Sequence, residues 1–76
     1  MALITNFEVL ELEKPNVHGP VEASLGAFNA GEETFIQINT YGRSGRKLTG
    51  KTSQTIQLDR EAAKKLVEVI KAQFQL

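Results

Sequence analysis

The feature that most constrains this chain is a change in hydrophobic period near residue 59. Polar and apolar residues alternate over 21–28, over 34–43 and over 51–58. Alternation places successive side chains on opposite sides of a strand. After Asp59 the apolar residues recur every three or four positions, which is typical of an amphipathic helix. The sequence therefore predicts strands followed by one C-terminal helix over 60–75.

The ends of these elements carry their own signals. The carboxylate of Asp59 can accept hydrogen bonds from the free N–H groups of a first helical turn, and Glu61 suits the positive end of the helix dipole. Residues 4–13 also read as a strand. Their apolar residues change from odd to even positions along it, which indicates a bulge or burial on both faces. Two prolines and a glycine predict a loop over 14–20. We expect one domain, 1–76, of the α+β class, with a four-stranded antiparallel sheet in the order β-β-β-β-α and the helix packed on one sheet face.

The length and composition limit how such a chain is stabilised. A domain of 76 residues buries only about 60% of its unfolded surface, and small domains usually need disulfides, a metal or a partner chain. There is no cysteine and only one histidine, which excludes a disulfide and a thiolate or histidine-rich metal site. Self-association remains, so we expect a homodimer. No apolar run approaches the ~20 residues of a membrane span. The lack of cysteine and of a signal-like start favours the cytoplasm.

Alternate positions along each strand point to opposite sides, so the alternation divides the expected sheet into two chemically different faces. One face is aliphatic and needs the helix as its cover; it carries Val21, Ala23, Leu25, Ile36, Ile38, Ile56 and Leu58. The other face mixes aromatic, amide, hydroxyl and cationic side chains; it carries Ser24, Phe28, Phe35, Gln37, Asn39, Tyr41, Arg43, Lys51, Ser53, Thr55 and Gln57.

The second face has the composition of a platform for single-stranded nucleic acid. Aromatic rings stack on unpaired bases, cations meet phosphates, and amides and hydroxyls reach base edges or phosphates. The candidate binding residues are Phe35, Gln37, Asn39, Tyr41, Arg43, Arg46, Lys47, Lys51 and Thr55. A solvated or protein-binding sheet face has a similar composition, so a protein-interaction module without a nucleic-acid role remains the alternative. DNA and RNA are not distinguished.

A P-loop pattern occurs in the chain but lacks its context. Residues 45–52, Gly-Arg-Lys-Leu-Thr-Gly-Lys-Thr, match that pattern, which must lead into a helix, whereas 53–58 read as a strand. We interpret 42–50 as a basic glycine-containing hairpin instead. Residues 34–58 hold four bases and no acid. The net charge of the whole chain is nevertheless zero, and this neutrality argues against strong nonspecific binding of polyanions. His18 and the glutamates have no evident catalytic partner, so we expect neither an enzyme nor a cofactor or metal.

The strand and helix order, with a basic hairpin before the last strand, resembles the positive cofactor four family. The residues that carry the resemblance are Phe35–Arg43, Lys47–Lys51, Ile56–Asp59 and the helix through Leu66. Members of that family are transcriptional coactivators and bacterial or phage relatives that bind single-stranded DNA as homodimers. The resemblance implies that Arg43, Lys47 and Lys51 hold phosphates, that Phe35 and Tyr41 stack on bases, and that the helix supports the dimer. The ribbon-helix-helix repressors are similar around 55–59, but they need a second helix that these 76 residues do not supply.

Overall fold

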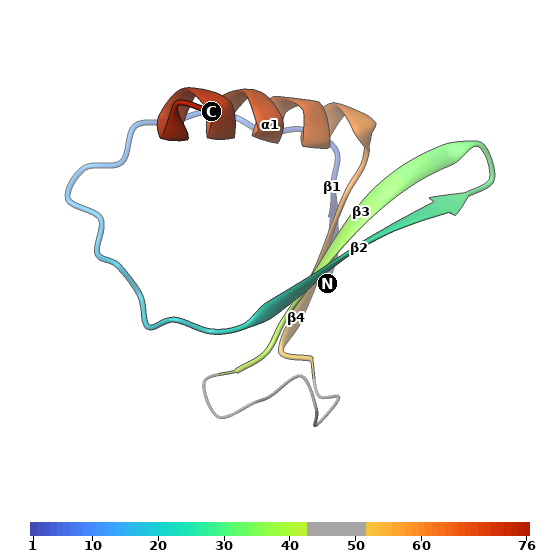
Figure 1. Cartoon of the computed structure of the whole chain (residues 1–76), viewed down its shortest axis with the longest axis horizontal. Helices are drawn as coiled ribbons and strands as arrows, with labels where there is room; N and C mark the ends of the chain where they lie inside the picture. The colour runs from blue at the N-terminus through green and yellow to red at the C-terminus, as the bar shows by residue number, and fades with distance from the viewer. Residues whose placement is uncertain (43–51) are drawn as a thin grey trace.

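The computed structural model describes residues 1–42 and 52–76, which form four strands and one helix (Figure 1). In chain order these are β1 (Ala2–Ile4), β2 (Ala23–Ala30), β3 (Glu33–Thr40), β4 (Gln54–Leu58) and α1 (Arg60–Phe74). The strands form one sheet in the order β1-β4-β3-β2, and α1 packs against β3 and β4. The predicted α+β class, with a C-terminal helix on one face of a four-stranded sheet, is confirmed.

The three longer strands pair antiparallel, as the alternation predicts. β2 lies two residues later than expected, because a two-residue turn at Gly31 and Glu32 lets the pairing run as far as Ala30 opposite Glu33. Gly31 has a φ of 64°, which glycine adopts without the steric cost that a side chain brings. β4 then pairs with β3 in a register that sets Leu58 opposite Ile36. The aliphatic residues of β2, β3 and β4 therefore share one face.

The expectation of a first strand over 4–13 in a fully antiparallel sheet was wrong. β1 covers only Ala2–Ile4 and runs parallel to β4. Ile4 lies opposite Leu58, the last residue of β4, and its carbonyl oxygen accepts a 3.3 Å hydrogen bond from the N–H of Asp59. Beyond this point β4 has ended and the chain has turned into the helix, so a longer β1 would have no partner. Residues 5–22 instead pass beside α1 and return in a wide loop to β2 (Figure 1).

The helix begins and ends where capping chemistry places its ends. Asp59 is the N-cap, and its Oδ1 accepts a 2.9 Å hydrogen bond from the N–H of Ala62. At the other end Gln75 adopts the left-handed conformation, and the N–H of Leu76 donates to the carbonyl oxygen of Lys71 at 3.1 Å. Such a reversal satisfies carbonyl groups that a helix end otherwise leaves free. Within the described residues, no helix has both the length and the apolar character that crossing a membrane requires.

The hydrophobic core of the described chain is small. Leu58 and Ala62 are buried where the start of α1 meets the sheet, and Tyr41 is buried at the far end of β3. In contrast, Leu25 on β2 is 73% exposed and Phe74 on α1 is 69% exposed. The amphipathic stripe predicted for the helix is present, but α1 covers only part of the aliphatic face of the sheet.

Candidate functional site

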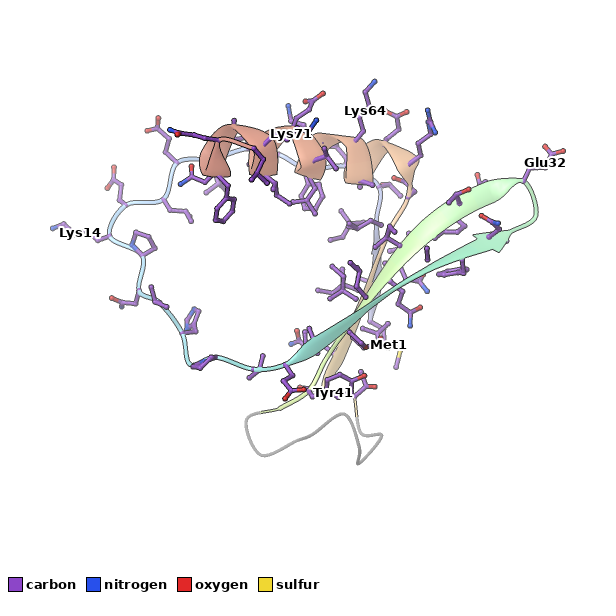
Figure 2. All side chains as sticks on the ribbon, in the orientation of Figure 1. Met1, Lys14, Glu32, Tyr41, Lys64 and Lys71 are labelled. Carbon is purple, nitrogen blue, oxygen red and sulfur yellow. The ribbon has the colours of Figure 1, made fainter. Side chains whose placement is uncertain are left out.

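The candidate site is the face of the sheet opposite α1, which we call the outer face. Its members come from three neighbouring strands, because the register sets Ser24, Asn39 and Thr55 side by side and sets Gln37 beside Gln57. The opposite parity carries Ile36 and Leu58, which line a hollow together with residues of α1. Nitrogen- and oxygen-bearing side chains project from the outer side, whereas those facing the helix are almost all carbon (Figure 2).

Four polar side chains of the outer face form a connected set of hydrogen bonds, the amide ladder. Gln57 Nε2 donates to Gln37 Oε1 at 2.9 Å, and Gln37 Nε2 donates to Asn39 Oδ1 at 3.1 Å. Thr55 Oγ1 donates to the same Asn39 oxygen at 3.1 Å. All four residues are half-buried. The bonds cross from β4 to β3 and hold the amide groups in fixed positions on the surface of the sheet.

The chemistry of the amide ladder allows it to adapt to a ligand. A hydroxyl group such as that of Thr55 can donate or accept, and a side-chain amide carries an acceptor and a donor group that rotation can exchange. The ladder can therefore run in either direction along the same four residues. It can present donors to a carbonyl or phosphate oxygen, or acceptors to an amino group, without a change in the backbone.

An aromatic pair lies at the end of the outer face near the β2–β3 turn. The rings of Phe28 and Phe35 stack with their centroids 5.3 Å apart and their planes 25° from parallel. Phe28 is 37% exposed and Phe35 is half-buried. Phe35 and Gln37 lie on the same side of β3, at a spacing of about 7 Å. One nucleotide-sized group can therefore contact both the aromatic pair and the amide ladder.

Tyr41 lies at the opposite end of the outer face. Its hydroxyl group is 2.9 Å from Ser24 Oγ, and its N–H donates to the carbonyl oxygen of Glu22 at 3.1 Å. The residue is only 9% exposed. In this arrangement Tyr41 fastens the end of β3 to β2 and leaves little of its ring free for stacking.

The four cationic candidates, Arg43, Arg46, Lys47 and Lys51, lie outside the described residues, as does nearly all of the expected basic hairpin. The residues on either side of this segment are described. Thr40 lies opposite Gln54, and the N–H of Ser53 donates to the carbonyl oxygen of Thr40 at 2.7 Å. The segment therefore joins neighbouring strands at the Tyr41 end of the outer face.

The structure thus brings five of the nine candidate residues onto one face and adds two that were not candidates. Phe28 and Gln57 were assigned to this face but not to the binding set. The partnership of Phe28 with Phe35, and of Gln57 with Gln37, depends on strand register, which alternation within each strand does not reveal. In the described ranges, 1–42 and 52–76, no group of three potential metal ligands is present.

Comparisons with known protein families, with curated proteins and with solved structures find no match for this chain.

Proposed function

We propose that this chain is a single-stranded nucleic-acid-binding module, for DNA as its resemblance to the positive cofactor four family implies, that acts as a homodimer. It binds through the outer face and through residues 43–51, which we call the basic segment. The observation that carries the proposal is the outer face itself. A stacked aromatic pair and a continuous row of hydrogen-bonded amide and hydroxyl groups lie together on the side that α1 leaves uncovered.

Single strands suit this surface better than duplexes do. Unpaired bases expose both their faces and their hydrogen-bonding edges, and stacking on an aromatic ring contributes roughly 1–3 kcal/mol per base. Phe28 and Phe35 supply such a ring surface. The amide ladder supplies groups that can meet either donors or acceptors, so little sequence preference is expected. The face is also a sheet surface, which does not have the shape of an element that enters a duplex groove.

The role of the cations in the basic segment is proposed from the sequence. Arg43, Arg46, Lys47 and Lys51 follow β3 directly and precede β4. We assign them to backbone phosphates, where their charge adds the salt-dependent part of the affinity. We assign Phe35, Gln37, Asn39 and Thr55 to bases and sugars, together with Phe28, whereas the buried Tyr41 supports the end of β3. For Arg43, Lys47, Lys51 and Phe35, these are the roles that the resemblance to the positive cofactor four family implies.

The proposed role is binding rather than catalysis. We propose that it acts as an accessory factor of transcription or replication. We place it in the cytoplasm, since it has no cysteine. Self-association is part of the proposal because the described chain buries so few apolar side chains.

The alternative is a protein-interaction module without a nucleic-acid role. The observation that favours it is the exposure of large apolar residues on β2 and α1, such as Leu25 and Phe74. These residues lie on the other side of the sheet from the amide ladder. The two proposals therefore concern different surfaces, and experiments can separate them.

The test is fluorescence anisotropy with a labelled oligothymidine and a labelled duplex of equal length, measured over a series of salt concentrations. We expect the single strand to bind more tightly, with log affinity falling linearly with log salt at about 0.7 per phosphate neutralised. Absence of binding at low salt, or equal binding to the duplex, would reject the proposal. The protein-interaction alternative predicts no binding to either.

A pair of charge-matched variants locates the site. Gln37→Glu with Gln57→Glu adds two negative charges to the outer face and removes the amide donors of these two residues, so circular dichroism must show that the sheet is retained. Asn6→Asp with Asn16→Asp adds the same charge elsewhere, since Asn6 lines a hollow beside α1 and Asn16 lies in the exposed loop. We expect the first variant to bind much more weakly than the second. Equal weakening would show that only the total charge matters.

A further inference from the structure

A glycine occupies the middle of the edge strand β2. Gly26 lies within Ala23–Ala30, and this strand pairs with β3 one residue to one residue along its whole length. Glycine weakens the interior of a strand, because it leaves the unfolded chain more freedom to lose and because it offers no side chain to pack. Its presence at this position therefore needs a physical reason.

The local structure supplies no such reason. A β-bulge sets two residues opposite one, whereas Gly26 lies opposite Gln37 alone. Within the described residues, Gly31 is the one glycine with a positive φ, so the backbone at Gly26 suits other residues as well. Crowding does not exclude a side chain, because a Cβ atom built on Gly26 meets nothing within 4 Å outside its two chain neighbours. The recurrent role that remains for a strand glycine is to let a ligand or another backbone come close.

Gly26 belongs to the outer face, where it leaves a space that we call the open position. Ser24 and Phe28 lie on the same side of β2, each about 7 Å away along the strand, and Gln37 lies opposite on β3. These three residues form the border of the open position. On the fourth side it is accessible from the edge, because β2 is the last strand of the described sheet.

Each side chain on the border is held by a partner of its own. Ser24 Oγ lies 2.9 Å from the hydroxyl group of Tyr41, and the ring of Phe28 stacks on that of Phe35. Gln37 is bonded within the amide ladder, to residues of β3 and β4. None of these contacts brings an atom over Gly26. The open position therefore exists before a ligand arrives, and its border is fixed.

The border has the chemistry that recognises a nucleobase. Phe28 is 37% exposed and offers ring surface to a flat group. Within the described residues, Nε2 and Oε1 of Gln37 each make one of the two hydrogen bonds that they can form. One donor and one acceptor therefore remain on a single amide group. Every base carries a neighbouring donor and acceptor on its Watson–Crick edge, whereas an ionised phosphate carries acceptors only and a sugar has no flat face.

We propose that Gly26 forms the floor of a base subsite on the outer face. One unpaired base of the bound strand lies over the bare backbone at Gly26, contacts the ring of Phe28 and bonds to the amide group of Gln37. A side chain at position 26 would occupy the same space as the base. The inference rests on the proposed binding of single strands and names the residue that makes room for the base.

The test compares the natural protein with Gly26→Val and with the smaller Gly26→Ala by fluorescence anisotropy at low salt. One probe is labelled oligothymidine, and the other is an abasic sugar–phosphate strand of the same length. We expect the dissociation constant for oligothymidine to rise about 5-fold or more in Gly26→Val and to rise in the same direction in Gly26→Ala. The abasic strand should bind the variants and the natural protein equally, because it has no base to exclude. Ala27→Val is the control, since Ala27 is an exposed neighbour on the opposite side of β2, and it should leave both affinities unchanged.

Urea unfolding shows whether the variants keep the fold. The midpoint should stay or rise when Gly26 is replaced, because a side chain is added to a strand without a clash. Gly26→Ala adds only a methyl group and carries the same comparison if valine lowers the midpoint. Folded Gly26 variants that bind oligothymidine as tightly as Ala27→Val, or that lose affinity for the abasic strand by the same factor, overturn the base subsite but leave the nucleic-acid proposal standing. A natural protein that binds neither strand rejects the proposed function and the subsite with it.

Discussion

Replacement of Phe35 by leucine should weaken the binding of single-stranded nucleic acid without unfolding the protein. Phe35 lies on β3 beside the amide ladder and stacks on Phe28 at 5.3 Å. Leucine keeps an apolar side chain at this position but removes the flat ring. It also leaves Phe28, which is 37% exposed, without the ring that supports it. The variant therefore removes the stacking surface and changes little else on the outer face.

The expected loss of binding affinity follows from the number of bases that can stack on the aromatic pair. The aromatic pair offers a platform for one base, and stacking on an aromatic residue contributes roughly 1–3 kcal/mol. At about 1.4 kcal/mol for each factor of ten, the dissociation constant should rise by about 5-fold to about 150-fold. The free energy of unfolding should fall by only about 0.5–1.5 kcal/mol, the usual contribution of an aromatic pair.

The assay is fluorescence anisotropy with labelled oligothymidine at one low salt concentration, and circular dichroism checks the fold. Phe7→Leu is the matched control, because it replaces the same residue type by leucine away from the outer face. Phe7 lies beside α1, in a hollow that is also lined by Lys64 and Glu68. The dissociation constant should rise by about 5-fold or more in Phe35→Leu and stay unchanged in Phe7→Leu. If a folded Phe35→Leu protein bound as tightly as the control, the stacking role of the outer face would be refuted.

Three further predictions concern other parts of the molecule. Lys47→Glu with Lys51→Glu should abolish oligothymidine binding at low salt; unchanged affinity in the same anisotropy assay would remove these residues from the site. Asp59→Ala should lower the free energy of unfolding in urea by about 1 kcal/mol, whereas Asp59→Asn keeps the cap; equal stability of the two would contradict the capping role. Sedimentation of the natural protein should give a dimer, because the described chain buries so few apolar side chains; a monomer that still binds oligothymidine would remove self-association from the proposal.

The elements with a strong local pattern were predictable from the sequence. The helix follows from its period and from Asp59, whose side chain needs only a neighbouring N–H group to act as a cap. Strands β2, β3 and β4 follow from alternation, because the two parities differ so clearly in polarity. These signals lie within a few residues of each element and do not depend on distant parts of the chain.

The first strand could not be predicted in the same way. Residues 4–13 have the composition of a strand, but a strand forms only where another strand offers free N–H and C=O groups. Among residues 1–42 and 52–76, β1 pairs only with the free edge of β4, which ends at Leu58. How far β4 extends, and in which direction β1 meets it, are properties of the assembled sheet.

In the candidate site, the face on which each residue lies was predictable from its own strand, whereas its contacts with other strands were not. Parity placed Phe35, Gln37, Asn39 and Thr55 on one face, and the structure brings all four together there. The hydrogen bonds that join them, and the pairing of Phe28 with Phe35, depend on cross-strand register. The low exposure of Tyr41 depends on the packing of β2 against the end of β3, which no single strand encodes.

The most direct test of the binding surface is a titration followed by nuclear magnetic resonance of the side-chain amide groups. Gln37, Asn39 and Gln57 each carry an NH₂ group on the outer face, whereas Gln73 carries one on α1. On addition of oligothymidine, the three outer-face resonances should shift together and saturate with the dissociation constant measured by anisotropy, while that of Gln73 stays in place. Shifts confined to the helix, or outer-face resonances that do not move while the oligonucleotide binds, would show that the ligand uses another surface.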